Sequence, residues 1–403
     1  MVMLACKFRL YPSRAVEEVL ESALNGCRII YNEMLGRMND AREQGTRLTE
    51  AETQLVAKEM RKSGPAFRHV HSKAAQMVSR RLWASIRALA ALKRHGKRVG
   101  RLRFKARGRF TSIEYNQSGF EVRPGEVCLS KIGTVKCITH RELPGVVRGV
   151  VIKHASDGKW WAAVQCKVPK REAAAILEPR EVGIDVGITT FAVDSDGNET
   201  GNPKFMDKAL PALRAAQKAL SRKKRCSGRY RKARVKLSKL YGTIADRRHD
   251  FLHKLSTWYV SNYDVICVEK LNIRGLAMKG RCKTLHRNIA DAAWGEFIRM
   301  LVYKASSAGK RVVLVDPRGT TTDCSRCGTP VPKQLWERIH SCPACGFTCC
   351  RDYNAARNIL ARGTGRAPTS VEERPIPAIP VQATGNGGQA VPMNREAPPF
   401  TAW

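Results

Sequence analysis

The sequence has 403 residues, with 72 Lys or Arg against 35 Asp or Glu, so its formal net charge is +37. A chain of this length can bury the cores of two or three domains. The excess positive charge repels itself unless a polyanion neutralises it, so we expect nucleic acid as the partner. With no apolar run of transmembrane length and no signal peptide, we expect no membrane binding, and the 14 cysteines are expected to be thiols and metal ligands in the cytoplasm.

The N-terminal part predicts one strand followed by a helical bundle. Residues 3–10 alternate apolar and polar side chains, as in a half-buried strand. Pro12-Ser13 signals the start of the first helix, and Thr49 with Glu52 forms a capping box for the second. The predicted helices cover residues 14–36, 49–62 and 72–95.

From residue 100 to residue 169 the hydrophobic period changes to two, and short strands alternate with Gly and Pro turns. This pattern favours a β-barrel to which the first strand returns. Basic residues mixed with aromatic ones on these strands suit a surface that binds nucleic acid. An ordinary antiparallel barrel with solvated charges fits equally well. The candidate contacts are Lys7, Arg9, Arg103 and Lys105.

Two apolar strands in the second half of the chain carry acidic residues. Asp185 lies within the strand 182–188, where a carboxylate is costly unless it is paired or bound to a metal. A hydrogen-bonded structural aspartate is the alternative. A later strand, 265–268, ends at Glu269, and one helix over 291–309 and the strand VVLVDP follow it.

A block of positive charge separates these two strands. Residues 208–240 contain 13 Lys or Arg and no acid. Leucines at helical spacing predict long helices with a break at Ser227-Gly228. Such a block is usually a solvated helix face or a disordered arm.

Two CxxC pairs stand near the C-terminus. They are separated by 14 residues, and a glycine follows each pair. This spacing predicts two knuckles that hold one tetrahedral Zn²⁺ through Cys324, Cys327, Cys342 and Cys345. Buried or disulfide-bonded cysteines are the alternative. Asp352 follows at the start of the helix YNAARNIL, where it could act as an N-cap or as a metal ligand.

Asp185, Glu269 and Asp352 can converge if their strands are neighbours in one sheet. Mg²⁺ prefers carboxylate and water oxygens and leaves room for a substrate phosphate. Two such ions would support in-line phosphodiester hydrolysis, with Asp185 bridging both and Glu269 and Asp352 each favouring one.

The sequence resembles one family, TnpB, the transposon-encoded RNA-guided nucleases related to the type V CRISPR effectors. The resemblance covers nearly all of residues 1–362. It is carried by KFRLYPS (7–13), GRLRFKARGRF (100–110), GIDVGITTFAV (183–193), VEKLNIRGL (268–276), the ribbon TTDCSRCG…CPACG and RDYNAARNIL (351–360). The family often has His-Asp or Leu-Asp just before Arg-Asp, whereas this chain has Cys349-Cys350, two spare thiols beside the zinc site.

The resemblance implies an α/β RNase H-like (RuvC) nuclease domain with an inserted zinc ribbon, and its catalytic acids match Asp185, Glu269 and Asp352. It also implies an N-terminal wedge β-barrel that carries an inserted helical recognition bundle. The expected boundaries are 1–12 and 97–175 for the wedge, 13–96 for the bundle, 176–320 and 347–362 for the nuclease domain, 321–346 for a nucleic-acid-binding ribbon and 363–403 for a disordered tail.

The function implied is cleavage of double-stranded DNA beside a short flanking motif, directed by a guide RNA from the transposon end, in a prokaryotic cytoplasm and without a required protein oligomer. A guide–target heteroduplex is read through its backbone, so the protein needs mainly cations. The basic block is a candidate lining for that channel, through Arg222, Lys223, Lys224, Arg225, Arg229 and Arg231. The alternatives are a nuclease-silent RNA-guided repressor, a recombinase or transposase that joins DNA ends, and a compact type V CRISPR effector.

Overall fold

The computed structural model describes residues 1–169, 178–273, 275–276, 282–334 and 336–366. Within these residues the chain forms two compact units, of which the first is Met1–Pro169 and the second follows it. The expected wedge–nuclease boundary at 175 lies outside the described residues, as does the expected disordered tail from 367 onward.

The first unit is built on a seven-stranded antiparallel sheet with the order β2-β6-β7-β1-β5-β4-β3. Strand β1 (Val2–Tyr11) pairs with β7 on one side and β5 on the other, which confirms that the first strand returns to the later ones. The Tyr115 hydroxyl of β2 donates to the Ser130 carbonyl 3.3 Å away, just after β4. Closure into a barrel stays a prediction. The other strands are β2 (Ser112–Asn116), β3 (Phe120–Arg123), β4 (Glu126–Leu129), β5 (Gly133–Ile138), β6 (Val146–His154) and β7 (Trp160–Val168).

Three helices share one hydrophobic core with this sheet. They are α1 (Arg14–Glu43), α2 (Glu50–Lys62) and α3 (Ser72–Arg94), with the short 3₁₀ helix η1 (Pro65–Phe67) between the last two. The Thr49–Glu52 capping box forms as predicted. The predicted end of the first helix at Gly36 is wrong. The helix continues because Leu35 and Ala41 are buried, and this burial outweighs the cost of about 1 kcal/mol for a glycine within a helix.

The second unit contains a five-stranded sheet with the order β10-β9-β8-β11-β12. Strands β8, β11 and β12 are parallel, and β9 runs antiparallel to β8 and to β10. The bounds are β8 (Glu181–Val186), β9 (Thr190–Asp194), β10 (Glu199–Gly201), β11 (Val265–Glu269) and β12 (Arg311–Val315).

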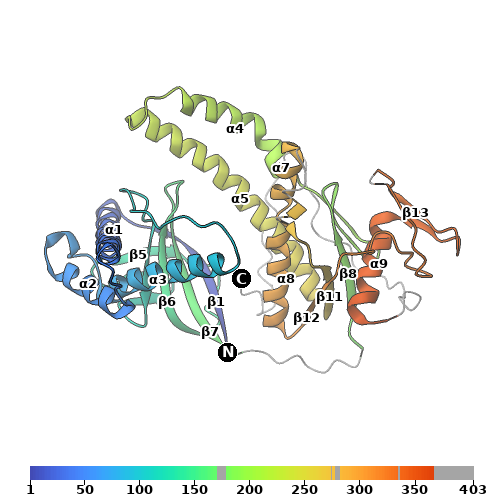
Figure 1. The fold of residues 1–403 in the computed structure, drawn as a ribbon, viewed down its shortest axis with the longest axis horizontal. Helices are drawn as coiled ribbons and strands as arrows, with labels where there is room; N and C mark the ends of the chain where they lie inside the picture. The colour runs from blue at the N-terminus through green and yellow to red at the C-terminus, as the bar shows by residue number, and fades with distance from the viewer. Residues whose placement is uncertain (170–177, 274, 277–281, 335, 367–403) are drawn as a thin grey trace. The chain divides into compact units, whose positions relative to one another are not determined.

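The helices of the second unit are α4 (Phe205–Ser221), α5 (Gly228–Asn262), α7 (Lys283–Ala292), α8 (Trp294–Ala308) and α9 (Arg351–Thr364). Helices α4 and α5 form the predicted pair of long basic helices (Figure 1). Ser227 caps α5, where its side chain accepts from the Tyr230 N–H. The single helix predicted over 291–309 is wrong. Ala293 has a φ of 53°, in the left-handed region, so the chain turns there and α7 and α8 are separate helices.

The two faces of the five-stranded sheet carry different cores. One face packs with α5 and α8 into a large apolar cluster that contains Ile184 and Val268. The other face packs with α9 into a small cluster that contains Cys267 and Leu360. Figure 1 shows α8 and α9 on opposite sides of the strands.

The cysteine-rich segment is inserted between β12 and α9. Its strands β13 (Ile339–Ser341) and β14 (Thr348–Cys350) pair antiparallel, so the hairpin extends past the expected limit at 346. Helix α9 likewise continues two residues past the expected limit at 362.

Candidate carboxylate edge and metal centre

Two of the predicted acids lie side by side on the α9 face of the sheet. Cys267 of β11 packs against α9, and its register partner on β8 is Gly183. Side chains alternate along a strand, so Asp185 and Glu269, two residues further on, face α9 as well. Both stand at the carboxyl ends of parallel strands, where substrates bind in many α/β folds.

Asp352 reaches the same face from α9. The helix lies so close to β8 that a Cβ at Gly183 would be 2.1 Å from the carbonyl oxygen of Ala356, so only glycine fits there. Asp352 precedes Ala356 by one helical turn, and Asp185 follows Gly183 by two residues. The N-cap position of α9 is Cys350, so Asp352 lies in the first turn and is not the N-cap.

The negative charges of two of the acids act on the third, Asp185. Burial, and then the negative charges of Glu269 and Asp352, raise the pKa of Asp185 well above its usual value. Burial also raises the pKa of Glu269, which a hydrogen bond from Thr320 and the charge of Arg362 partly oppose. A cation bound among the acids would offset the repulsion that favours the protonated form of Asp185.

Glu269 is held in position by residues that the sequence analysis does not predict. The Thr320 hydroxyl lies 2.5 Å from Glu269 Oε1, and both residues are buried. The carbonyl of Thr320 accepts a hydrogen bond from the Asn358 side chain of α9. The available signal is a pair of asparagines, Asn354 and Asn358, which are four residues apart and therefore lie on one side of the helix.

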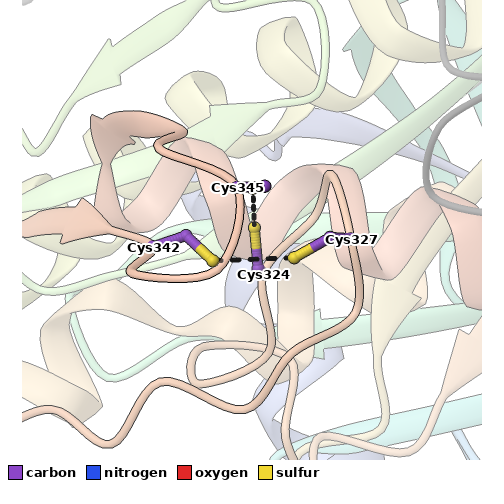
Figure 2. Close-up of side chains that lie close together, drawn as sticks. All are labelled: Cys324, Cys327, Cys342 and Cys345. Atoms are coloured by element: carbon purple, nitrogen blue, oxygen red, sulfur yellow. Dashed lines mark hydrogen bonds between the residues drawn. The ribbon is translucent and has the colours of Figure 1, made fainter.

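The four predicted cysteines gather into one site. Their sulfur atoms all lie within 4.8 Å of one another, and Figure 2 shows them pointing to a common centre. The Sγ–Sγ distances are 3.7 Å for Cys324–Cys345 and 3.5 Å for Cys327–Cys342. A tetrahedron with Zn–S bonds of about 2.3 Å has edges of about 3.8 Å, so the quartet fits Zn²⁺.

The two knuckles repeat one backbone pattern. The N–H of Cys324 donates to the Thr329 carbonyl, and the Gly328 N–H donates to the Cys324 carbonyl. The equivalent bonds of the second knuckle join Cys342 to Phe347 and Gly346 to Cys342. Hydrogen bonds from the hydroxyl and N–H of Thr329 lower the pKa of Cys327 to about 6, which favours the thiolate that a metal needs.

The spare thiols and the carboxylates stand outside this tight cluster. Within the described part of the chain, the metal-ligating atoms gathered within 4.8 Å are the four sulfurs, without Cys349, Cys350 or the three acids. The carboxylates therefore form a more open set. An open set of oxygen donors suits Mg²⁺, which keeps several waters and takes substrate oxygens as further ligands.

The predicted nucleic-acid contacts lie in three places. Lys7 and Arg9 are on β1, where Lys7 Nζ lies 4.0 Å from the centroid of the Trp161 ring and Arg9 lies above the same ring. Arg103 and Lys105 are exposed in an irregular segment before β2. The six basic residues of the α4–α5 hairpin, Arg222, Lys223, Lys224, Arg225, Arg229 and Arg231, are all exposed at its turn and at the start of α5.

Comparison with known proteins identifies the class. A solved structure, the cryo-EM structure of a Cas12f1–sgRNA–target DNA complex, shares the fold with a TM-score of 0.56 and 15% identity, covering 86% of this chain and 83% of that chain. Three family descriptions match: "Helix-turn-helix domain" over residues 1–47, "Probable transposase" over 164–279 and "Cas12f1-like, TNB domain" over 294–359. Residues 1–47 nevertheless contain a strand and one long helix, β1 and α1.

Two curated relatives match almost the whole chain. A Streptomyces pristinaespiralis protein, named as a candidate RNA-guided DNA endonuclease, is 34% identical over 368 residues, which is 89% of each chain. The Escherichia coli K12 protein InsQ, with the same type of name, is 29% identical and is covered over 92% of its length. This chain therefore belongs to the TnpB family, the OrfB proteins of IS605-type elements, as the resemblance in its motifs predicted. Within the described residues, no helix is both long and apolar enough to cross a membrane.

Proposed function

We propose that this protein is an RNA-guided endonuclease that cuts double-stranded DNA at the edge formed by Asp185, Glu269 and Asp352. The observation that carries the proposal is the convergence of three acids from separate parts of the sequence on the α9 face of one sheet. The sheet order, with three parallel strands and an antiparallel neighbour beside β8, supports the RNase H-like (RuvC) assignment.

The proposed chemistry is hydrolysis of a phosphodiester. When bound, two Mg²⁺ ions supply Lewis-acid activation of the attacking water and of the leaving 3′ oxygen. Asp185 lies on β8, beside the strand that carries Glu269 and under the helix that carries Asp352, and it would contribute to the binding of both cations. Thr320 holds the Glu269 carboxylate in one orientation through its hydroxyl. Arg362, near Glu269, limits the rise in its pKa and so favours the ionised form that a cation requires.

We propose guide RNA and target DNA as the partners of the cationic surfaces. The exposed turn of the α4–α5 hairpin presents Lys223, Lys224 and Arg225, with no acid between residues 208 and 240. Replacing these three residues by alanine should reduce the slope of log affinity against log salt by about 2 to 3, since each phosphate contact contributes about 0.7 to 0.9. Binding should be measured from 50 to 400 mM salt. An unchanged slope would remove the hairpin from the proposed interface.

The proposed function is tested with the complex purified with its own RNA. A plasmid carrying the sequence that matches the RNA guide is incubated with Mg²⁺, beside a plasmid with a scrambled target. Linearisation of the matched plasmid alone supports the proposal. Binding without cutting indicates the RNA-guided repressor, and joined strands indicate the recombinase or transposase. Sequencing the RNA distinguishes a transposon-end guide from the repeat-derived guide of a CRISPR effector.

A further inference from the structure

We propose that Thr320, Asn354 and Asn358 are positioning residues that couple the zinc ribbon to the carboxylate edge. In this arrangement, zinc bound by the four cysteines strengthens divalent-cation binding at Glu269. The inference rests on the proposed function of the acids, and it adds an energetic link between the two metal sites.

The link begins at Glu269. Thr320 is 1% exposed and Glu269 is 8% exposed, so neither side chain has ready access to water as a substitute partner. The single hydroxyl hydrogen of Thr320 can reach Glu269 Oε1 at 2.5 Å or the Pro317 carbonyl at 3.0 Å. An ionised Glu269 only accepts, so it takes this hydrogen. Thr320 therefore fixes the carboxylate in the state in which it binds a cation.

The link continues along the polar side of α9. Asn354 uses both ends of its amide: its oxygen accepts from the Ser325 N–H at 2.9 Å, and its nitrogen donates to the Asp323 carbonyl at 2.8 Å. Asn358 donates to the carbonyls of Thr320 at 2.9 Å and Asp323 at 2.6 Å. These bonds satisfy backbone groups of residues 320–325, which lie outside the named strands, so neither amide is replaceable by an apolar side chain without cost.

A turn and an ion pair hold the same segment from the solvent side. Arg362, one further turn along α9, pairs with the Asp323 carboxylate at 2.6 Å and also donates to the Arg318 carbonyl. Gly319 turns with a φ of 76°, and a Cβ there would lie 2.7 Å from Asp323 Oδ2. The backbone from Thr320 to Asp323 is thus held at one end by the turn at Gly319 and at the other by the ion pair of Asp323 with Arg362.

The first zinc ligand is part of this path. Cys324 stands between Asp323 and Ser325, the two residues whose backbones bond to Asn354. A metal ion that fixes the Cys324 sulfur therefore restrains the backbone that positions Thr320. Coupling between two binding sites is reciprocal, so a cation at Glu269 must raise the affinity for zinc by the same factor by which zinc raises the affinity for the cation.

The first test measures the Thr320 contact. Mn²⁺ binding to the zinc-loaded full chain, freed of nucleic acid, is measured by calorimetry for the wild type, Thr320→Val and Thr320→Ser. We expect Thr320→Val to weaken binding about 10-fold while retaining its zinc, and Thr320→Ser to restore it. Thr364→Val is the matched control, because that hydroxyl bonds within α9 to the Leu360 carbonyl. Equal affinity of Thr320→Val and the wild type would overturn the proposal.

The second test measures the coupling itself. Zinc affinity is measured by equilibrium competition with a zinc-selective chelator, with and without Mn²⁺, for the wild type, Asn358→Ala and the control Asn262→Ala, whose amide bonds within α5. We expect Mn²⁺ to raise the zinc affinity several-fold in the wild type and the control but not in Asn358→Ala, and an unchanged zinc affinity in a wild type that binds Mn²⁺ would overturn the proposal. The same response in Asn358→Ala would refute the coupling. A wild type that binds no Mn²⁺ and cuts no DNA would instead refute the proposed nuclease site.

Discussion

The two faces of the five-stranded sheet use the same strands for different purposes. On the α5–α8 face, Phe191 packs edge to face against Phe251 and Phe297, with ring centroids 5.0 and 5.4 Å apart. On the α9 face the apolar cluster is small, and beside it Gly183 lies against the helix backbone and two asparagines are buried. The first face supplies most of the apolar burial. The second buries less apolar surface and instead brings α9 and the three carboxylates close to the strands. Stability and function are thus separated by the alternation of side chains along β8 and β11.

The largest expected effect comes from Asp185→Asn on the α9 face. Cation stabilisation of several kcal/mol would be lost, which corresponds to a fall in cleavage rate of about 10³-fold at about 1.4 kcal/mol per tenfold. Cleavage is measured at saturating Mg²⁺ on the matched plasmid. The control is Asp246→Asn on α5, an exposed aspartate outside the proposed site. Undiminished cleavage by Asp185→Asn would contradict the proposed site.

The same substitution should raise stability when no divalent cation is present. The folded-state pKa of Asp185 is raised, so the folded protein holds a proton more tightly than the unfolded chain does. This stabilising contribution is complete below the unfolded pKa of about 3.9 and is lost as pH rises through the folded pKa. We therefore expect the melting temperature of Asp185→Asn to exceed that of the wild type at pH 8 in EDTA, and Mg²⁺ to narrow the difference.

Phe297→Ala tests the apolar face. Phe297 is 0% exposed and contacts Phe191 and Tyr259, so truncation should lower the free energy of unfolding by about 3 to 5 kcal/mol. Urea unfolding measures the loss. Because the α9 face is unchanged, the Mg²⁺ concentration that gives half-maximal cleavage should stay the same in the folded fraction. A large change in that concentration would mean that the two faces are not separate.

Much of the difference between the two faces of the sheet could be predicted from local sequence patterns. The apolar residues of β8 and β11 predict two buried strands that carry acids near their ends, and the spacing of the cysteines with the glycines that follow predicts the quartet. The capping box at Thr49 predicted a helix start for the same reason, because its bonds join residues only three positions apart.

The features that were missed depend on contacts between distant segments. No residue pattern around Ala293 predicts a left-handed turn. Helix α1 continues through Gly36 only because residues on both sides of it are buried in the core. Thr320 gains its role from Glu269, which lies 51 positions earlier in the chain. The Asn354–Asn358 spacing was visible, but its partners were not, since they lie in a loop without regular structure.

A smaller and more local effect is expected from the cysteines. Cys327→Ser removes a ligand and should leave less than one zinc per chain, whereas Cys349→Ser and Cys350→Ser should retain it, because both sulfurs lie outside the quartet. Zinc is measured by elemental analysis of the purified proteins. Loss of zinc from Cys349→Ser would place that thiol among the ligands in solution.

The smallest expected effect at neutral pH concerns a cation within the apolar face. Lys304 of α8 is 1% exposed, and its Nζ lies 2.7 Å from each of three acceptors on α5, the His253 carbonyl and the hydroxyls of Ser256 and Thr257. Both hydroxyls already donate to backbone carbonyls, so the amine must supply the hydrogens. Burial nevertheless lowers the pKa of Lys304 to about 7.

The pH dependence of unfolding tests whether burial or the three hydrogen bonds have the stronger effect on the pKa of Lys304. With a lowered pKa, the unfolded chain binds more protons between pH 7 and about 10, so wild-type stability should rise over that range relative to Lys304→Met. At pH 7 the variant should lie within about 1 kcal/mol of the wild type, because every acceptor keeps another hydrogen bond and the methionine packs in the apolar cluster. Parallel stability curves for the two proteins would mean that the three acceptors restore an ordinary lysine pKa.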